Sequence, residues 1–296
     1  MKYLIKQCDW EITDRCNLNC LHCIINKKRK ELNTKQCFFI IDILKKLGCK
    51  EINFTGGEPL TRKDFFEILR YSKNKGIIIK VFTNGILVNK QNIKNLKKFV
   101  DYLGFSIEGL EKENNKIRGS NSFRKILSAI KIAKKENINF GIYVTISRFN
   151  VHKLEEFLTF IKSLNPMNIS LNEIVYRRKA RKNKKKLFCR INPYKIVTLV
   201  KKIFPDQKFR KEMRCDINPK KIFLVADGKF YLCTEIFHIN PSLYIGKFFP
   251  QNFKRYGLFL KTYKSLKPPF KCPYITYASN NISINLLTKD KCWMVK

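Results

Sequence analysis

Three cysteines, Cys16, Cys20 and Cys23, stand close together near the start of the chain. Their spacing, Cys-x3-Cys-x2-Cys, places three thiols in one short loop just after an expected strand, Trp10–Thr13. Three thiolates fill three corners of a cubane iron–sulfur cluster and leave the fourth iron without a protein ligand. A structural metal site is closed, whereas a catalytic site keeps an open position. The pattern therefore predicts an iron–sulfur centre that can bind a further molecule.

Other residues able to bind a ligand follow later strands of the expected fold. The first group is Gly56-Gly57-Glu58-Pro59, in which the two glycines let the backbone approach a ligand and Glu58 places a carboxylate beside it. The polar turn Thr83-Asn84-Gly85 follows the next strand, and Ser106 ends the strand after that. Arg118 comes later still, and its guanidinium is suited to a carboxylate by geometry and by charge.

Short β-branched or aromatic runs alternate with amphipathic helical stretches through the first 176 residues. This alternation predicts βα units on a parallel sheet, and right-handed crossovers would wind six of them into a partial barrel. The predicted fold is therefore α/β, a partial (β/α)6 TIM-like barrel with a small C-terminal α+β domain that contains a β-hairpin. Ligand-binding residues should then meet at the carboxyl ends of the strands. The expected strands are Trp10–Thr13, Glu51–Thr55, Ile77–Thr83, Tyr102–Ile107, Phe140–Ser147 and Asn168–Tyr176.

The order of these motifs over most of residues 8–165 resembles the signature of the radical S-adenosylmethionine (radical SAM) superfamily. The resemblance implies a [4Fe-4S] cluster on Cys16, Cys20 and Cys23, with S-adenosylmethionine (SAM) on its open iron. Reduction of the cluster would cleave SAM, and the resulting 5′-deoxyadenosyl radical would abstract hydrogen from a substrate. A flavodoxin- or ferredoxin-type protein would donate the electron.

The same resemblance implies how SAM is held. Glu58 would contact the amino group of the methionine, with Gly56 and Gly57 beside it, and Arg118 would pair with the carboxylate. Ser106 would lie near the ribose, and the backbone of His22 would contact the adenine. The Thr83-Asn84 turn is expected at the same site.

The last third of the chain contains a hairpin signal at Asp227-Gly228. Cys215 and Cys233 stand on either side of it, an arrangement that resembles the start of SPASM and twitch domains, which carry auxiliary iron–sulfur clusters. The run of four close cysteines found in a full SPASM domain is incomplete, because only Cys272 and Cys292 follow. We expect one auxiliary cluster on these four cysteines; the alternative is a degenerate domain that holds none.

Residues 177–186 are almost entirely basic and precede an expected helix. A polyanion-binding arm and a solvated linker both fit this composition, and the absence of aromatic residues weakens the case for single-stranded nucleic acid. The predicted division is a radical SAM core at 1–176, a basic linker and helix at 177–204, and a SPASM/twitch-like domain at 205–296.

The 296 residues carry 61 Lys and Arg against 23 Asp and Glu, a net charge of +38. Such charge attracts polyanions, but the lysines are spread along nearly the whole chain, so a general compositional drift is the favoured explanation. The sequence shows no secretory signal and no apolar stretch of about 18 residues, so no membrane span is expected. Eleven cysteines without export favour metal or catalytic use in a reducing cytoplasm.

Three functions remain open at this point. The favoured one is maturation of a ribosomally made peptide or protein, since domain pairings of this kind often modify peptides and the positive charge suits an acidic leader. Only fifteen residues precede Cys16, so we expect no separate peptide-recognition domain there. Oxidation of a small alcohol or sugar is the second function, and a non-catalytic iron–sulfur protein associated with nucleic acid is the third.

Overall fold

We describe the protein from a computed structural model. It describes residues 5–25, 29–208, 210–212, 221–231, 246–247, 274–278 and 281–287.

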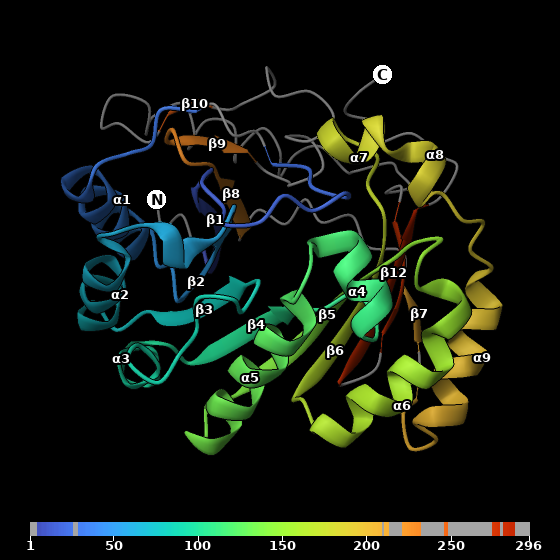
Figure 1. Cartoon of the computed structure of the whole chain (residues 1–296). Helices are drawn as coiled ribbons and strands as arrows, with labels where there is room; N and C mark the ends of the chain where they lie inside the picture. The colour runs from blue at the N-terminus through green and yellow to red at the C-terminus, as the bar shows by residue number, and fades with distance from the viewer. Residues whose placement is uncertain are drawn as a thin grey trace.

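Six parallel strands form the centre of the molecule, and each pairs with the next along the chain. All six expected strands are present, and the predicted partial (β/α)6 barrel is confirmed (Figure 1). The sixth ends three residues earlier than predicted, because the chain turns after Glu173 towards a short helix. The strands are β1 (Gln7–Thr13), β2 (Glu51–Gly56), β3 (Ile78–Thr83), β4 (Tyr102–Ser106), β5 (Phe140–Ile146) and β6 (Asn168–Glu173).

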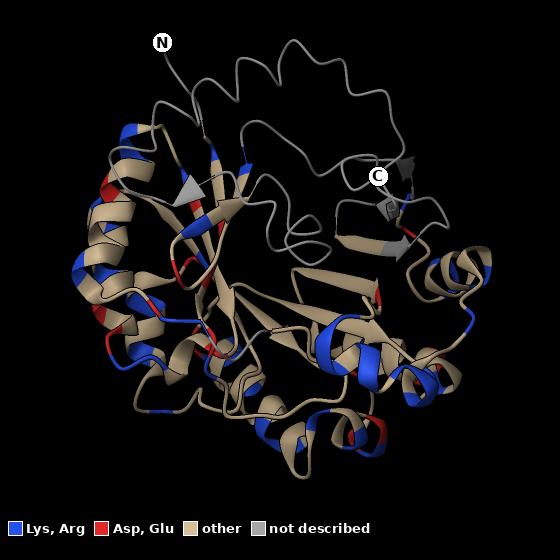
Figure 2. Ribbon diagram, turned by 90° about the horizontal axis from the view of Figure 1, so that it is seen from above, with Lys and Arg blue, Asp and Glu red and all other residues tan. Residues whose placement is uncertain are grey.

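Helices cover the outer face of this sheet, and seen from above they form an arc around the strands (Figure 2). Alternate strand residues such as Phe54, Val81 and Phe105 are fully buried on this outer face. Ribbon segments coloured blue for Lys and Arg occur on helices all along the arc, in line with lysines spread along nearly the whole chain. The helices of the arc are α1 (Thr34–Lys46), α2 (Phe65–Asn74), α3 (Ile93–Phe99), α4 (Glu111–Arg118), α5 (Ser122–Lys135), α6 (Leu154–Leu164) and α9 (Pro193–Ile203).

The inner face of the strands carries charged and polar side chains beside a few aromatic ones, unlike the outer face. Asp9 on β1 accepts a hydrogen bond from Asn53 on β2 (2.8 Å), and Lys80 on β3 pairs with Glu51 on β2 (2.8 Å). Because side chains alternate between the two faces of a strand, one face packs against the helices and the other lines the barrel interior.

Strands from the last third of the chain extend this sheet at both edges. On one side β8 (Lys221–Leu224) runs parallel to β1, and β9 (Lys229–Tyr231) returns antiparallel to β8. The predicted Asp227-Gly228 hairpin is confirmed, and Gly228 adopts a φ of +83° that favours glycine. On the other side β12 (Ile282–Leu287) runs parallel to β6. The outermost strands are β10 (Gly246–Lys247), next to β9, and β11 (Tyr274–Ala278) and β7 (Arg210–Glu212), beyond β12.

The described strands therefore form one twelve-stranded sheet. The division into units at 1–176, 177–204 and 205–296 stays a prediction, although strands from the last of these ranges pair directly with β1 and β6. Among the described helices, none combines the length and the apolar character needed to cross a bilayer.

The pairing of β8 with β1 makes Leu224 part of the main core, where it is fully buried. We expect Leu224→Ala to lower the free energy of unfolding by about 2–5 kcal/mol, because it leaves a cavity. Met167→Ala is the control, since that side chain is 54% exposed and its loss should change stability by about 0.5 kcal/mol or less. Equal effects in urea titrations of the two variants would show that β8 contributes nothing to the core.

Candidate functional site

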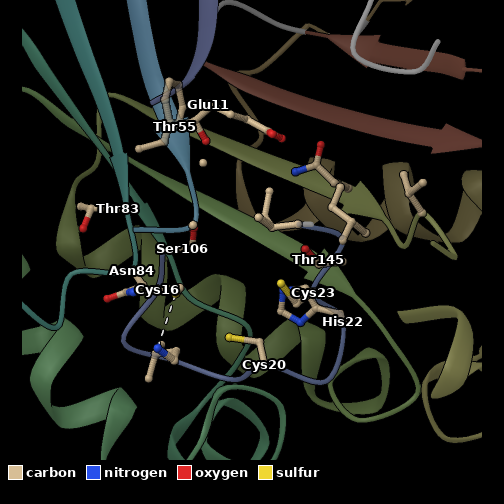
Figure 3. Close-up of a pocket in the computed structure, with 18 of the residues that line it drawn as sticks. Glu11, Cys16, Cys20, His22, Cys23, Thr55, Thr83, Asn84, Ser106 and Thr145 are labelled. Carbon is tan, nitrogen blue, oxygen red and sulfur yellow. Dashed lines mark hydrogen bonds between the residues drawn. The ribbon is translucent and has the colours of Figure 1, made fainter. Parts of the chain in front are cut away.

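A cavity of about 580 Å³ opens at the carboxyl ends of the strands and is bordered by the three cysteines (Figure 3). It brings together residues from β2, β3, β4, α4 and the cysteine loop, residues 16–23, as expected for a parallel sheet of this kind. Every predicted residue of the cluster and SAM site except Glu58 lines it. These residues are Cys16, Cys20, His22, Cys23, Gly56, Gly57, Thr83, Asn84, Ser106 and Arg118.

Donors from the protein point at the sulfur of Cys16. The backbone N–H of Leu18 lies 3.4 Å from Cys16 Sγ, and the side-chain amide of Asn84 lies 3.8 Å from it. The same amide donates to Asn17 Oδ1 at 2.8 Å, so the end of β3 is tied to the cysteine loop. Burial raises the pKa of Cys20, and the nearby guanidinium of Arg118 opposes this shift. The donors at Cys16 would stabilise a thiolate there, whereas burial disfavours a thiolate on Cys20.

The two glycines of the Gly-Gly-Glu-Pro turn have a role that the sequence did not suggest. A Cβ on Gly57 would lie 2.0 Å from the carbonyl oxygen of Arg15, and one on Gly56 would lie 2.3 Å from that of Thr13. Gly57 N also donates to Thr13 O at 2.8 Å. The glycines thus let β2 lie directly against the chain that leads from β1 into the cysteine loop.

Glu58 lies beneath this turn, fully buried. Its carboxylate accepts hydrogen bonds from the Thr83 hydroxyl (2.8 Å) and from the backbone N–H groups of Asn84 (2.7 Å) and Leu60 (3.2 Å). Burial raises its pKa from the ordinary value of 4.5 to about 7, although these donors oppose the shift. In this structure Glu58 holds the Thr83-Asn84 turn, and its contact with SAM stays a prediction.

Glu108, which follows β4, is a buried acid that the sequence analysis missed. Its Oε1 accepts from Nε (3.1 Å) and Nη2 (2.5 Å) of Arg118, and its Oε2 accepts from the backbone N–H of Thr145 (2.5 Å). Arg118 is therefore already paired where it borders the cavity. The position of Glu108, two residues after Ser106 at a strand end, is the signal that could have found it.

His22 packs against the same acid. Its Nε2 lies 3.5 Å from Glu108 Oε1, and burial lowers its pKa to about 4, so the ring is neutral at pH 7. Its Nδ1 is buried and has no hydrogen-bond partner within the described part of the chain. A buried polar atom without a partner is unfavourable, and it marks a place where a bound molecule can supply one.

The basic stretch after β6 folds over the cysteine loop. It forms α7 (Arg178–Lys182) and α8 (Lys184–Leu187). Lys179 Nζ donates to Asn19 Oδ1 at 2.7 Å, Asn183 Nδ2 to Leu21 O at 3.0 Å, and Ala180 N to Cys23 O at 3.3 Å. Part of the stretch predicted as a linker or polyanion arm therefore supports the loop.

The residues present fit the cofactors that the motifs imply. Three thiols border one cavity, donors point at Cys16, and His22, whose buried Nδ1 has no hydrogen-bond partner among the described residues, lines the same cavity. Cys8, Cys37 and Cys49 are instead buried in the core, as small apolar side chains often are. The four candidate ligands of an auxiliary cluster, Cys215, Cys233, Cys272 and Cys292, lie outside the described residues.

Comparison with known proteins gives a consistent result. The family model of the radical SAM superfamily matches residues 10–161. The chain is 33% identical over 173 residues to Fe-coproporphyrin III synthase of Methanosarcina barkeri, covering 56% of this chain and 43% of the relative. It is 36% identical over 157 residues to the mycofactocin maturase MftC of Mycobacterium tuberculosis, covering 51% of this chain and 40% of the relative. The matched part thus spans less than half of either relative.

Solved structures share the fold. The structure of anSMEcpe with bound AdoMet and the Kp18Cys peptide has a TM-score of 0.70 and 18% identity, and covers 90% of this chain and 84% of that one.

The raised pKa of Glu58 should make stability depend on pH. The folded state keeps a proton on Glu58 between about pH 4.5 and 7 that the unfolded state has released. The stability that this proton supports is therefore present below about pH 4.5 and is lost as the pH rises through 7. Relative to Glu58→Gln, the free energy of unfolding of the wild type without SAM should fall by up to about 3 kcal/mol between pH 4.5 and 8. Denaturant titrations check this, and a difference that stays constant with pH would contradict it.

The contact between α7 and the cysteine loop predicts an effect on loop opening. Lys179→Met removes its bonds to Asn19, so backbone amides of the loop should exchange hydrogen about five- to tenfold faster. Lys185→Met removes the same charge from an exposed position in the same stretch and should leave the exchange unchanged. Equal exchange in both variants, measured by mass spectrometry, would mean that Lys179 does not support the loop.

Proposed function

This chain belongs to the radical SAM superfamily, and on that premise we propose that it matures a ribosomally made peptide or protein by radical chemistry. Membership makes it an enzyme that uses a [4Fe-4S] cluster and SAM, which contradicts the third function, a non-catalytic protein. When bound, the cluster and SAM supply reductive cleavage to a 5′-deoxyadenosyl radical, which abstracts hydrogen from a substrate carbon. The identity of that substrate is the proposed part.

One observation carries the proposal: the three thiols of the cysteine loop border the same cavity as the residues at the ends of β2, β3 and β4. The thiols would hold the cluster. Arg118, held in place by Glu108, would face the SAM carboxylate. The Thr83-Asn84 turn, held by Glu58, would border SAM on the opposite side. The cavity walls would shield the reacting atoms from water, as radical chemistry requires.

The choice of a peptide rests on relatives. One is a maturase, and a structure with the same fold was solved with a bound peptide. The likeness to Fe-coproporphyrin III synthase supports a small-molecule substrate, as in the second function, oxidation of a small alcohol or sugar, but its name does not indicate that reaction. Both relatives extend well beyond the matched part, so neither decides the substrate.

The reaction also needs a source of electrons and a cellular setting. We infer one auxiliary cluster on Cys215, Cys233, Cys272 and Cys292, and a flavodoxin- or ferredoxin-type electron donor. None of the seven cysteines in the described part forms a disulfide, which supports a reducing cytoplasmic setting.

Anaerobically reconstituted protein with dithionite and SAM should form 5′-deoxyadenosine, measured by liquid chromatography. Cys20→Ala should abolish this product, because the cluster loses one of its three ligands. Cys37→Ala, which removes a thiol buried in the core, should keep it.

A wild type that forms no 5′-deoxyadenosine would overturn the proposal, and so would activity retained by Cys20→Ala. Iron analysis separates one cluster from two, at about four irons per chain against about eight.

A further inference from the structure

The cavity continues from the cysteine loop into the barrel, along the inner faces of β1 and β2. Glu11 lies opposite Thr55 in the strand register, and Asp9 lies opposite Asn53. Figure 3 shows Glu11 and Thr55 at the end of the cavity away from the three cysteines. Asp9 and Asn53 stand two residues deeper on the same strand faces, a step of about 7 Å. All four residues line the cavity.

Asn53 has an acceptor without a donor. The residue is only 8% exposed, and its Nδ2 donates to Asp9 Oδ1 at 2.8 Å. Its Oδ1 is buried and has no hydrogen-bond partner among the described residues. Exchanging the amide oxygen and nitrogen of Asn53 does not resolve this, because the oxygen would then face the Asp9 carboxylate, which only accepts hydrogen bonds. A buried acceptor of this kind is unfavourable unless a bound molecule brings a donor.

The neighbours of Asn53 are acceptors as well. Asp9 Oδ2 forms an ion pair with Lys221 Nζ at 2.8 Å, which shows that a protonated amine fits against this carboxylate. Glu11 is buried and pairs with Arg29 at 2.5 Å. Asp9 Oδ1 also accepts from Gln7 Nε2 at 3.3 Å. A carboxylate can accept about four hydrogen bonds, so these contacts leave about one acceptor position on Asp9 and further capacity on Glu11.

The charge of the cavity differs from that of the whole chain. Its lining includes three acidic residues, Asp9, Glu11 and Glu173, against two basic ones, Arg118 and Lys221. The chain as a whole has 23 acidic and 61 basic residues. The compositional drift towards lysine therefore does not extend to the cavity wall.

We propose that Asp9, Glu11 and Asn53, at the deep end of the cavity, bind a protonated amine or guanidinium group of the substrate. Hydrogen bonds from such a group to carboxylates are charge-assisted and strong. The inference rests on the proposed function, which places SAM at the cysteine end and a substrate beyond it. For a peptide substrate, the group is a lysine or arginine side chain near the modified residue.

Four capped tripeptides of the form Gly-X-Gly test this preference for a cation, in which X is arginine, lysine, glutamine or glutamate. Each is titrated calorimetrically into the full chain carrying its cluster and SAM, without reductant. The arginine or lysine peptide should bind at least about tenfold tighter than the glutamine peptide, and the glutamate peptide should bind weakest. Asn53→Leu and Asp9→Asn should each remove this preference.

Glu51→Gln is the matched control. Glu51 lies on the same face of β2 and pairs with Lys80 at 2.8 Å, and it does not border the cavity. This variant removes one negative charge, as Asp9→Asn does, and should keep the preference. Circular dichroism checks that each variant folds, and if Asn53→Leu does not, Asp9→Asn carries the comparison.

Three results would overturn the proposal: equal binding of the four peptides, no binding of the arginine peptide up to about 10 mM, or tightest binding of the glutamate peptide. If the glutamate peptide binds tightest to the wild type but loses this advantage in Lys221→Met, the site binds an anion instead. Because no reductant is present, none of these outcomes depends on SAM cleavage. Absence of 5′-deoxyadenosine with dithionite would instead count against the proposed function.

Discussion

The carboxylate of Glu108 is the buried charge on which the arrangement of the cofactor end depends. It joins Arg118 at the end of α4 to the backbone of Thr145 on β5, and it lies beside His22 of the cysteine loop. A buried charge must be paired to be tolerated, so these elements have little freedom to separate. The backbone of Leu21 also donates to Ile117 O at 2.9 Å, one residue before Arg118. Helix, strand and loop are thus held as a unit around the place where the thiols and the guanidinium meet.

Much of this arrangement could be predicted from the sequence. The cysteine spacing and the Gly-Gly-Glu-Pro turn are local patterns, and alternating strands and helices bring their ends together by topology alone. Glu108 was missed because its role arises from tertiary contacts: Asn150, 42 residues later, donates to its carbonyl oxygen. Its own dipeptide, Glu108-Gly109, resembles an ordinary loop.

The roles of Lys179 and Glu58 show the same limit. A run of basic residues indicates a solvated segment, and nothing in it reveals that one lysine reaches a loop 160 positions earlier. The resemblance of the Gly-Gly-Glu-Pro turn to the family motif implies that Glu58 contacts SAM, which stays a prediction. Its hydrogen bonds to the Thr83-Asn84 turn were not predicted, because they depend on where that turn lies. Such contacts are set by packing between distant segments, which local sequence patterns do not encode.

The pairing of β8 with β1 and of β12 with β6 has a consequence for how the protein assembles. Trp10 pairs with Leu224, and Ile169 pairs with Ile282, so each edge of the six-stranded centre stays uncovered until the last third of the chain has been made. Unpaired strand edges invite association with other chains, and contacts between such distant residues form slowly. During synthesis the nascent barrel therefore passes through a stage at which both edges are open, and completion of its sheet is among the last events of folding.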